Sequence, residues 1–471
     1  MMRMTALLAL ALSFATALAT ETTLPKRVQS VLELRRLPPE SLSVYVEDLD
    51  SGDVLLSWQE LEPRNPGSTI KLLTTLAALD ILGPAYVWQT EVYALGEVES
   101  GQLNGDLLIK GNGDPFLVTE RVWQLLRDIR QAGIREIDGD LLIDDSYFQV
   151  PQDEPAAFDR QPLRAYNVAP NALLMNFKVV RYWFEPDHDA DSVHVWLDPP
   201  LGNLQVDNKL SLAPGSCRGY QRGIAISANE AYDRMTVSGS FPRGCKRYAM
   251  DRTALSHNAF VYGLFVSLWR ESGGVFHGGW KNAVVADGAE PIVVFGSLPL
   301  ADVITRVNKH SNNVMARQLL HTLSAEVLGE PGTEHGGRKV VGDWLDEKGL
   351  EFSALAFDNG AGLSRDARMS ALDLGKMLKF AWRQPYMPEY VSSLSLSGLD
   401  GTLRSRFEDP ALKGNAHLKT GSLDHVTAIA GYLQARSGKR FVVVTLQNYQ
   451  DVHRGPGREV QEAVLRWVFD H

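Results

Sequence analysis

The sequence has few cysteines, and after its first 20 residues it has no apolar run long enough to cross a membrane. A bilayer span needs about 20 consecutive apolar residues, so we expect no transmembrane segment in the mature chain. No stretch rich in Lys and Arg stands out and the net charge is −10, so nucleic acid is not an expected partner. The 11 histidines contain no H-E-x-x-H spacing, and we therefore expect no catalytic metal and no cofactor.

One acidic segment resembles the opening of a calcium loop. Asp187, Asp189 and Asp191 have the required spacing, but the sixth position is Ser192 and the twelfth is Asp198, where such loops carry Gly and Glu. We expect a solvated acidic loop.

The first 19 residues have the features of a secretory signal peptide. The single charge of Arg3 precedes a short apolar run, and the small residues Ala15, Ala17 and Ala19 close the segment. Cleavage after Ala17 or after Ala19 fits this pattern, and we favour Ala19 because polar residues follow it. We expect an exported, periplasmic protein.

Cys217 and Cys245 are the only cysteines. An even pair in an exported chain favours a disulfide, which on the chain-entropy model stabilises the fold by roughly 3 to 4 kcal/mol. The alternative is that both thiols are reduced and buried.

The two ends of the chain have the pattern of one mixed α/β domain. A hairpin of two strands, 43–49 and 54–58, precedes a dense apolar segment, 68–82, that predicts a buried helix. After Pro291 helical periodicity returns, and three strand-like runs follow before an amphipathic terminal segment. The expected helices are 314–328, 338–348, 371–382 and 459–469, and the expected strands are 416–422, 427–435 and 440–446.

The middle of the chain differs, because short strand-like pieces there are broken by Gly, Pro and Asp. One helix, 118–132, interrupts them. We interpret 91–282 as an inserted β-rich region, two small domains, and 20–90 with 283–471 as one discontinuous domain.

Ser68 opens an S-x-x-K motif that ends at Lys71. Residues three apart lie on one face of a helix, so the amine of Lys71 can accept the proton of the Ser68 hydroxyl. At the first helical turn, the Ser68 N–H and the helix dipole also lie near an oxygen that becomes negative. The motif is weak alone, because Ser and Lys are common.

The single K-T-G of the chain, Lys419-Thr420-Gly421, lies in a strand-like run and is followed by Ser422. A glycine there allows a ligand backbone to approach closely. We predict that the Thr420 and Ser422 hydroxyls hold a substrate carboxylate, and that the N–H groups of Ser422 and Ser68 form an oxyanion hole. The alternative is an ordinary edge lysine near a turn.

An S-x-N element occurs three times, beginning at Ser227, Ser256 and Ser311. Ser311 is the best placed, because it lies between the other two motifs and opens a helical segment. For the first two, which lie in or near the end of the insertion, a hydrogen-bonded turn or a helix cap is favoured.

In this order, S-x-x-K, S-x-N and K-T-G resemble the serine acyl-enzyme set of penicillin-binding proteins and serine β-lactamases. The surrounding segments are similar to the low-molecular-mass class C penicillin-binding proteins, the D-Ala-D-Ala carboxypeptidase/endopeptidase family. Those segments are 166–170, 308–313, 358–365 and 397–403. The 239 residues between Lys71 and Ser311 match the two extra domains that this family carries there.

The resemblance implies a penicillin-binding/β-lactamase-like transpeptidase domain, with a five-stranded antiparallel sheet flanked by helices. It also implies a function: a Ser68 acyl-enzyme that acts on peptidoglycan stem peptides and is acylated by β-lactam antibiotics as covalent inhibitors. The expected products come from D-Ala-D-Ala carboxypeptidase and DD-endopeptidase activity.

The same resemblance implies roles for further residues. Ser311 relays a proton to the departing amine, Lys419 lowers the pKa of its neighbours, and Asn313 binds the substrate amide. Arg365 and Asp159 are expected to recognise the acidic end and the ammonium group of a diamino-acid side chain.

Two alternatives remain at this level. A serine β-lactamase shares the acyl-enzyme but hydrolyses it rapidly with a further base, and a non-catalytic peptidoglycan-binding module keeps the cleft without turnover.

Overall fold

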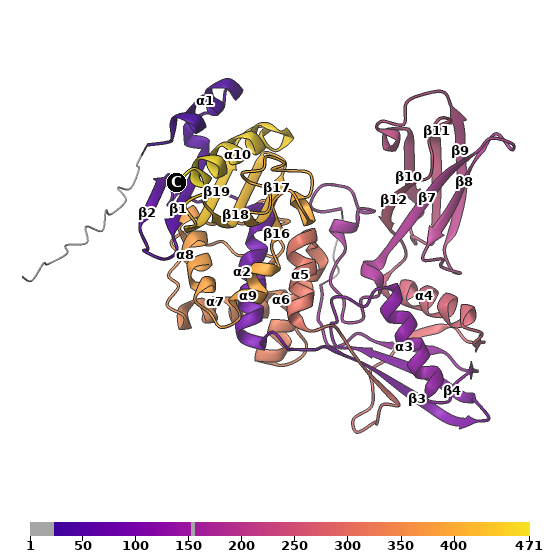
Figure 1. The fold of residues 1–471 in the computed structure, drawn as a ribbon. Coiled ribbons are helices and arrows are strands. Elements are labelled where there is room, and N and C mark those ends of the chain that lie inside the picture. Colours follow the sequence, from indigo (N-terminus) through magenta and orange to yellow (C-terminus); the bar gives the residue numbers. More distant parts are fainter. Residues whose placement is uncertain (1–22, 152–155) are drawn as a thin grey trace, which may run out of the picture.

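The computed structural model describes residues 23–151 and 156–471 (Figure 1). The expected signal peptide, 1–19, lies outside the described residues. Within the described ranges, no helix combines the length and the apolar character that a membrane crossing needs.

A six-stranded antiparallel sheet joins the two ends of the chain, in the order β16-β17-β18-β19-β1-β2. The hairpin β1–β2 comes from the N-terminal part, and the other strands come from the C-terminal part. The bounds are β1 Leu42–Asp48, β2 Val54–Trp58, β16 Ser395–Leu396, β17 Ala416–Leu423, β18 Val426–Gln434 and β19 Arg440–Asn448. The five expected strands are present, and the two-residue β16, too short for a sequence pattern, is added at one edge.

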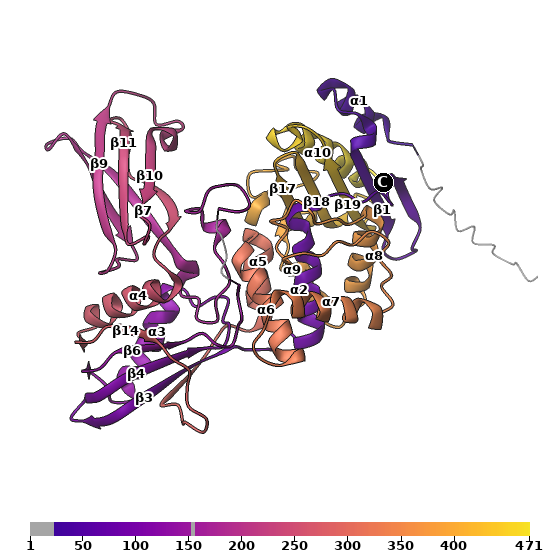
Figure 2. The ribbon, with the colours of Figure 1, turned by 180° about the vertical axis from the view of Figure 1, so that it is seen from behind.

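Helices cover both faces of this sheet, and its strands are therefore apolar on both sides. Along β19, Val442 and Val444 face one core and Phe441 and Val443 face the other. The first core packs against α2 Lys71–Leu82, α5 Leu300–His310, α6 Asn313–Leu328, α7 Glu334–Glu347, α8 Ala371–Trp382 and α9 Met387–Ser392. The second packs against α1 Lys26–Arg35 and α10 Pro456–Phe469. Figures 1 and 2 show α2 running through the centre of this helical layer.

The inserted region forms two further sheets to one side of this domain (Figures 1 and 2). The first consists of β3 Gln89–Glu99, β4 Gln102–Gly111, β5 Glu136–Ile137, β6 Leu141–Asp144, β13 Val275–Phe276, β14 Trp280–Asn282 and β15 Val293–Gly296, and it packs with α3 Thr119–Gln131 and α4 His257–Glu271. Since β3 begins at Gln89 and pairs with β15, this sheet extends beyond the expected limits at 91 and 282.

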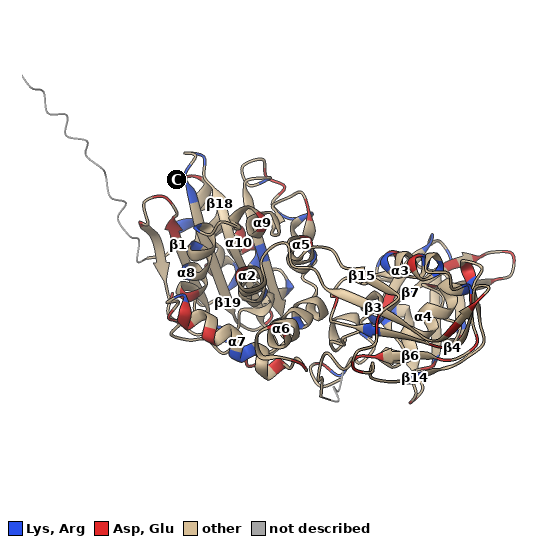
Figure 3. Ribbon diagram, turned by 90° about the horizontal axis from the view of Figure 1, so that it is seen from below, with Lys and Arg blue, Asp and Glu red and all other residues tan. Residues whose placement is uncertain are grey.

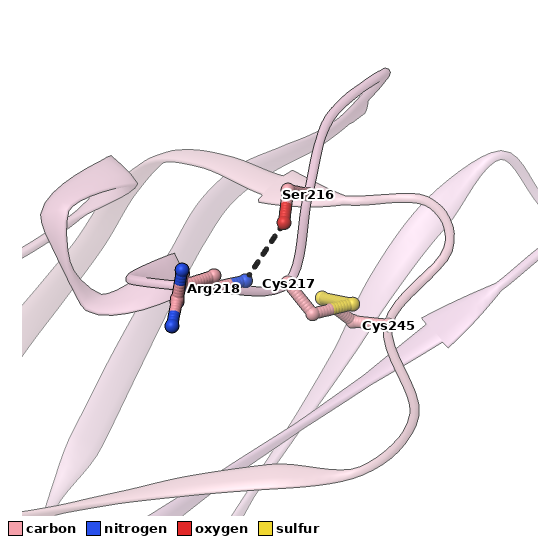
Figure 4. Close-up of a disulfide and its surroundings, with 4 residues drawn as sticks. All are labelled: Ser216, Cys217, Arg218 and Cys245. Carbon is pink, nitrogen blue, oxygen red and sulfur yellow. Dashed lines mark hydrogen bonds between the residues drawn. A yellow bond between two sulfur atoms is a disulfide. The ribbon is translucent and has the colours of Figure 1, made fainter.

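The second inserted sheet has the order β10-β11-β9-β8-β7-β12. Its bounds are β7 Val179–Asp187, β8 Ser192–Asp198, β9 Gln205–Ala213, β10 Ile224–Ala228, β11 Arg234–Pro242 and β12 Tyr248–Thr253. The structure joins Cys217 and Cys245 in a disulfide with Cα atoms 5.3 Å apart, linking the loop after β9 to the loop after β11 (Figure 4). Beside the bridge, the Arg218 N–H donates to the Ser216 hydroxyl.

Acidic and basic residues are interspersed along the ribbon in both parts of the molecule (Figure 3). The acidic segment between β7 and β8 is a local turn, in which the Asp187 carboxylate accepts the backbone N–H groups of Asp189 and Ala190.

Candidate active site

Ser68 lies in a single 3₁₀ turn, Gly67–Ile70, that leads directly into α2. We expected the helix to begin at Ser68, but α2 begins at Lys71. In a 3₁₀ turn the side chains three apart eclipse each other, and this places Lys71 directly over the serine. The Lys71 Nζ donates to the Ser68 Oγ at 3.0 Å.

The Lys71 amine is fully buried and fully hydrogen-bonded. Besides Ser68, it donates to the Asn313 Oδ1 at 2.7 Å and to the carbonyl oxygen of Ala361. Burial, and next the charge of Lys419, hold the pKa of Lys71 well below its ordinary value. A lysine with a lowered pKa is neutral for part of the time and can then accept the proton of Ser68.

Ser311 and Lys419 form a second pair of serine and lysine. Ser311 has a left-handed backbone (φ 56°) between α5 and α6, and Asn313 is the first residue of α6. The Lys419 Nζ donates to the Ser311 Oγ and to the Thr420 carbonyl, each at 2.8 Å. Burial lowers the pKa of Lys419 to about 7. The site therefore holds two lysines that give up their protons readily.

The K-T-G segment lies in β17, with its free edge against the turn that carries Ser68. On that edge β16 pairs only with His417 and Leu418. From Thr420 onward this edge of β17 therefore has no strand partner, while the other edge pairs with β18. A Cβ atom on Gly421 would lie 2.5 Å from the Pro66 carbonyl oxygen and 3.0 Å from the Ser68 nitrogen. Only glycine permits this approach, which brings the backbone of β17 next to the Ser68 N–H.

The two residues expected to recognise a diamino acid, Arg365 and Asp159, each contact other protein groups in the structure. The Arg365 guanidinium lies 4.8 Å from the centre of the Phe158 ring, next to Asp159 in sequence, and 3.5 Å from the Asp424 carboxylate. Asp159 accepts the Tyr166 hydroxyl proton at 2.5 Å and an Asn167 amide proton at 2.9 Å. Burial alone would raise the pKa of Asp159, but these hydrogen bonds outweigh it and hold the pKa below its usual value.

Three residues in the site were not assigned a role from the sequence. The Ala361 carbonyl accepts from Lys71, Thr402 accepts the Thr420 hydroxyl proton at 2.9 Å, and the Tyr166 carbonyl accepts from the Asn313 amide at 3.3 Å. All three lie in the segments whose resemblance to the class C family was noted. No periodicity or spacing could show that they reach the motifs.

Among the described residues, two side-chain clusters have the composition of a metal site. In the first, Glu136, Asp138 and His277, the imidazole already contacts the Glu136 carboxylate at 2.9 Å. In the second, ligand atoms of His425, Asp451 and His453 lie within 4.8 Å of one another. Each imidazole, however, accepts a backbone N–H at Nδ1, His425 from Asp451 and His453 from His425. A neutral ring that accepts at Nδ1 carries its proton on Nε2, so neither ring offers a free lone pair. The hydrogen bonds favour a structural role for this cluster.

The site combines a serine under a buried lysine, a second serine–lysine pair and an edge strand that carries a glycine, all on a sheet covered by helices. This combination defines a serine acyl-transfer enzyme of the penicillin-binding class. The chain belongs to the D-Ala-D-Ala carboxypeptidase 3 (S13) family, whose model matches residues 24–469. It is therefore a serine-type D-Ala-D-Ala carboxypeptidase, as the sequence predicted.

Curated and solved relatives agree with this assignment. The chain is 28% identical over 467 residues to a D-alanyl-D-alanine carboxypeptidase of Actinomadura sp. (strain R39), covering 94% of this chain and 84% of that protein. It shares its fold with penicillin binding protein 4 (dacB) from Haemophilus influenzae (TM-score 0.79, 21% identity, 94% and 99% coverage), which has also been solved in complex with a β-lactam. A predatory endopeptidase, Bd3459 from Bdellovibrio bacteriovorus, is more distant (TM-score 0.53, 14% identity, 90% and 91% coverage).

Proposed function

We propose that this carboxypeptidase is exported to the periplasm, removes terminal D-alanine from peptidoglycan stem peptides through an acyl-enzyme on Ser68, and also cleaves cross-links as a DD-endopeptidase. The observation that carries the proposal is the pair of fully buried lysines, each of which donates to a serine hydroxyl. We also propose that the two ends of the chain, predicted as 20–90 and 283–471, form the catalytic domain around the insertion predicted as 91–282, whose first sheet extends to Gln89 and Gly296.

In acylation, neutral Lys71 takes the Ser68 proton as Oγ attacks the carbonyl carbon of the scissile amide. The N–H groups of Ser68 and Ser422 hold the negative oxygen. Ser311 passes its hydroxyl proton to the amide nitrogen and takes a proton in return from protonated Lys419, which donates to it. The bond between that nitrogen and the carbonyl carbon breaks, and the amine departs. Water then attacks the ester, one of its protons returns to Ser68, and the peptide is released with a new carboxylate.

Residues of β17, of α6 and of the segments that carry Arg365 and Asp159 hold the substrate. The Thr420 and Ser422 hydroxyls bind the terminal carboxylate, and the neighbouring positive charge of Lys419 favours it when that amine is protonated. Asn313 binds the substrate amide. Arg365 binds the acidic end of a diamino-acid side chain and Asp159 its ammonium, which requires Asp159 to exchange a hydrogen bond within its own loop.

Acylation by β-lactams follows from the same nucleophile. Among the described residues, the hydrogen-bond partners of Lys71 include no carboxylate that could position a water for rapid deacylation. A long-lived penicilloyl ester on Ser68 is therefore expected, in contrast to the rapid turnover of a β-lactamase.

Digestion of purified peptidoglycan, with the products separated by mass, tests the proposal. The wild type is compared with Ser68→Ala and with a control, Ser437→Ala, which changes an exposed serine in the β18–β19 turn. We expect the wild type and Ser437→Ala to release D-alanine and to reduce cross-linked dimers, and Ser68→Ala to do neither. Release of D-alanine without loss of dimers would remove the endopeptidase activity from the proposal. Equal digestion by Ser68→Ala would refute the mechanism, and an inactive but folded wild type would favour the non-catalytic binding module.

A further inference from the structure

A cavity of about 1130 Å³ adjoins the active site and is not used by the reaction. At one end it is lined by Ser311 and Asn313. The other walls come from the insertion: the start of α3, the end of α4, and the sheet that contains β7 and β12. Small-molecule sites usually occupy about 300 to 1000 Å³, so this cavity has room for more than one small molecular unit. Any ligand that fills it beside Asn313 is close enough to be a covalent continuation of the substrate.

The charge of the walls restricts what that continuation can be. Four carboxylates line the cavity, those of Glu120, Asp198, Asp251 and Glu271, against the single guanidinium of Arg181. Arg181 is already paired with Asp251, through contacts of 2.8 and 3.1 Å. Asp198 lies opposite Arg181 in the β7–β8 pair and helps Asp251 to raise the pKa of Arg181, whereas Glu120 and Glu271 have no ion-pair partner among the described residues. A stem peptide that carries carboxylates is repelled by such walls, whereas a neutral ligand rich in hydroxyl donors can hydrogen-bond to them.

Aromatic side chains supply the second feature of the cavity. Trp123 lies on the outer face of α3, away from the core that Val122, Leu125 and Leu126 enter, and 49% of it is exposed. The Tyr166 ring, 39% exposed, lines the same cavity near Asn313. The Arg127 guanidinium lies 6.0 Å from the centre of the Trp123 ring. The exposed indole of Trp123 provides an apolar face for the C–H groups of a sugar ring, and the carboxylates of the cavity can accept hydrogen bonds from the sugar hydroxyls.

We propose that this cavity binds the neutral glycan strand to which the stem peptide is attached. The inference rests on the proposed peptidoglycan substrate and adds to it a subsite of stated chemistry, a chain of N-acetylated hexose units. Bound there, the glycan directs its own stem peptide toward Ser311 and Asn313. The enzyme then acts faster on disaccharide-linked peptides than on free peptides of the same sequence.

Two substrates with the same pentapeptide, one free and one carried by a disaccharide, test this on the full chain. We expect kcat/KM for the disaccharide-linked substrate to exceed that for the free peptide by about 10-fold, the effect of one well-packed aromatic contact with its hydrogen bonds. Trp123→Ala is expected to bring the ratio of the two values toward one, and Trp123→Phe to retain part of it. The matched control Trp467→Ala removes an indole of α10 that packs against His471 and does not line the cavity, so it should leave the ratio as in the wild type.

A direct binding measurement keeps the test independent of catalysis. Titration of the wild type with a β-1,4-linked tetramer of N-acetylglucosamine should give binding by calorimetry that Trp123→Ala weakens about 10-fold. Glu120→Gln and Glu271→Gln, which preserve shape, serve if Trp123→Ala does not fold, and each should also weaken binding. Equal kcat/KM for the two substrates with no tetramer binding would overturn the inference, as would self-association of the wild type that Trp123→Ala abolishes. If neither peptide is hydrolysed but the tetramer binds at this site, the proposed function fails and the sugar site stands.

Discussion

Gly421 lies where β17 passes the turn of the nucleophile, and Gly421→Ala tests whether this close approach controls the chemistry. The added Cβ would lie 2.5 Å from the Pro66 carbonyl oxygen. An ordinary contact between carbon and a carbonyl oxygen is about 3.3 Å, so the strand and the turn must separate by about 0.8 Å. A displacement of about 1 Å between reacting groups costs about 10²-fold in rate, and we expect Gly421→Ala to lower the rate constant of acylation by about 30- to 100-fold.

The assay is the second-order rate of labelling by a fluorescent penicillin, with thermal unfolding measured on the same samples. Gly342→Ala is the matched control, because it lies in α7 with no atom within 4 Å of an added Cβ. It should label at the wild-type rate and gain about 0.5 to 1 kcal/mol of helix stability. If folded Gly421→Ala is acylated as fast as the wild type, the edge of β17 does not form the oxyanion hole as described.

Three further predictions concern the lysine, the disulfide and a residue that the sequence did not identify. Burial lowers the pKa of Lys419 from 10.5 to about 7, so between these pH values the unfolded chain binds more protons and the free energy of unfolding rises with pH. Urea denaturation at about pH 7 and about pH 9 should show a smaller rise in this free energy for Lys419→Met than for the wild type. An equal rise in the two proteins would contradict the assigned shift. Cys217→Ser should lose about 3 kcal/mol of stability, measured by denaturation under oxidising conditions, and an unchanged midpoint would show that the bridge contributes nothing. When substrate binds, the Thr420 proton turns from Thr402 to the carboxylate and the Thr402 hydroxyl donates to Thr420 in return, which holds Thr420 in place. Thr402→Val removes that support and should raise KM for a D-Ala-D-Ala peptide by about 5-fold with a smaller change in kcat, whereas a loss confined to kcat would assign Thr402 to the reaction itself.

Elements with one strong pattern were predictable from the sequence. The dense apolar segment that ends at Leu82 became the central helix α2, and the strand-like runs from Ala416 onward became β17, β18 and β19. These segments bury apolar side chains on both sides, and the composition shows this directly.

Elements that depend on distant partners were not predictable. Helix α1 buries only Val28 and Leu32, and it is stabilised by packing near α10 at the other end of the chain. Strand β15 follows the rest of the insertion in sequence and pairs with β3 at its start, so that sheet extends beyond the expected limit at residue 282. No local pattern in either segment records its partner.

The candidate site divides in the same way. The motifs gave Ser68, Lys71, Ser311, Asn313 and Lys419. Hydrogen bonds join Ser68, Lys71 and Asn313 in one group and Ser311 with Lys419 in a second, and Asn313 is only two residues from Ser311 along the chain. The carbonyl of Ala361 contributes a backbone atom 290 residues away from Lys71, and a backbone atom has no sequence signature.

The central claim is that Ser68 is the nucleophile of a slowly deacylating penicillin-binding enzyme. Incubation of the full chain with benzylpenicillin, followed by proteolysis and mass mapping, tests it most directly. The account predicts one penicilloyl group, on the peptide that contains Ser68, which persists after free antibiotic is removed and is absent from Ser68→Ala. A label on another residue, or rapid release of hydrolysed penicillin with no adduct, would contradict it.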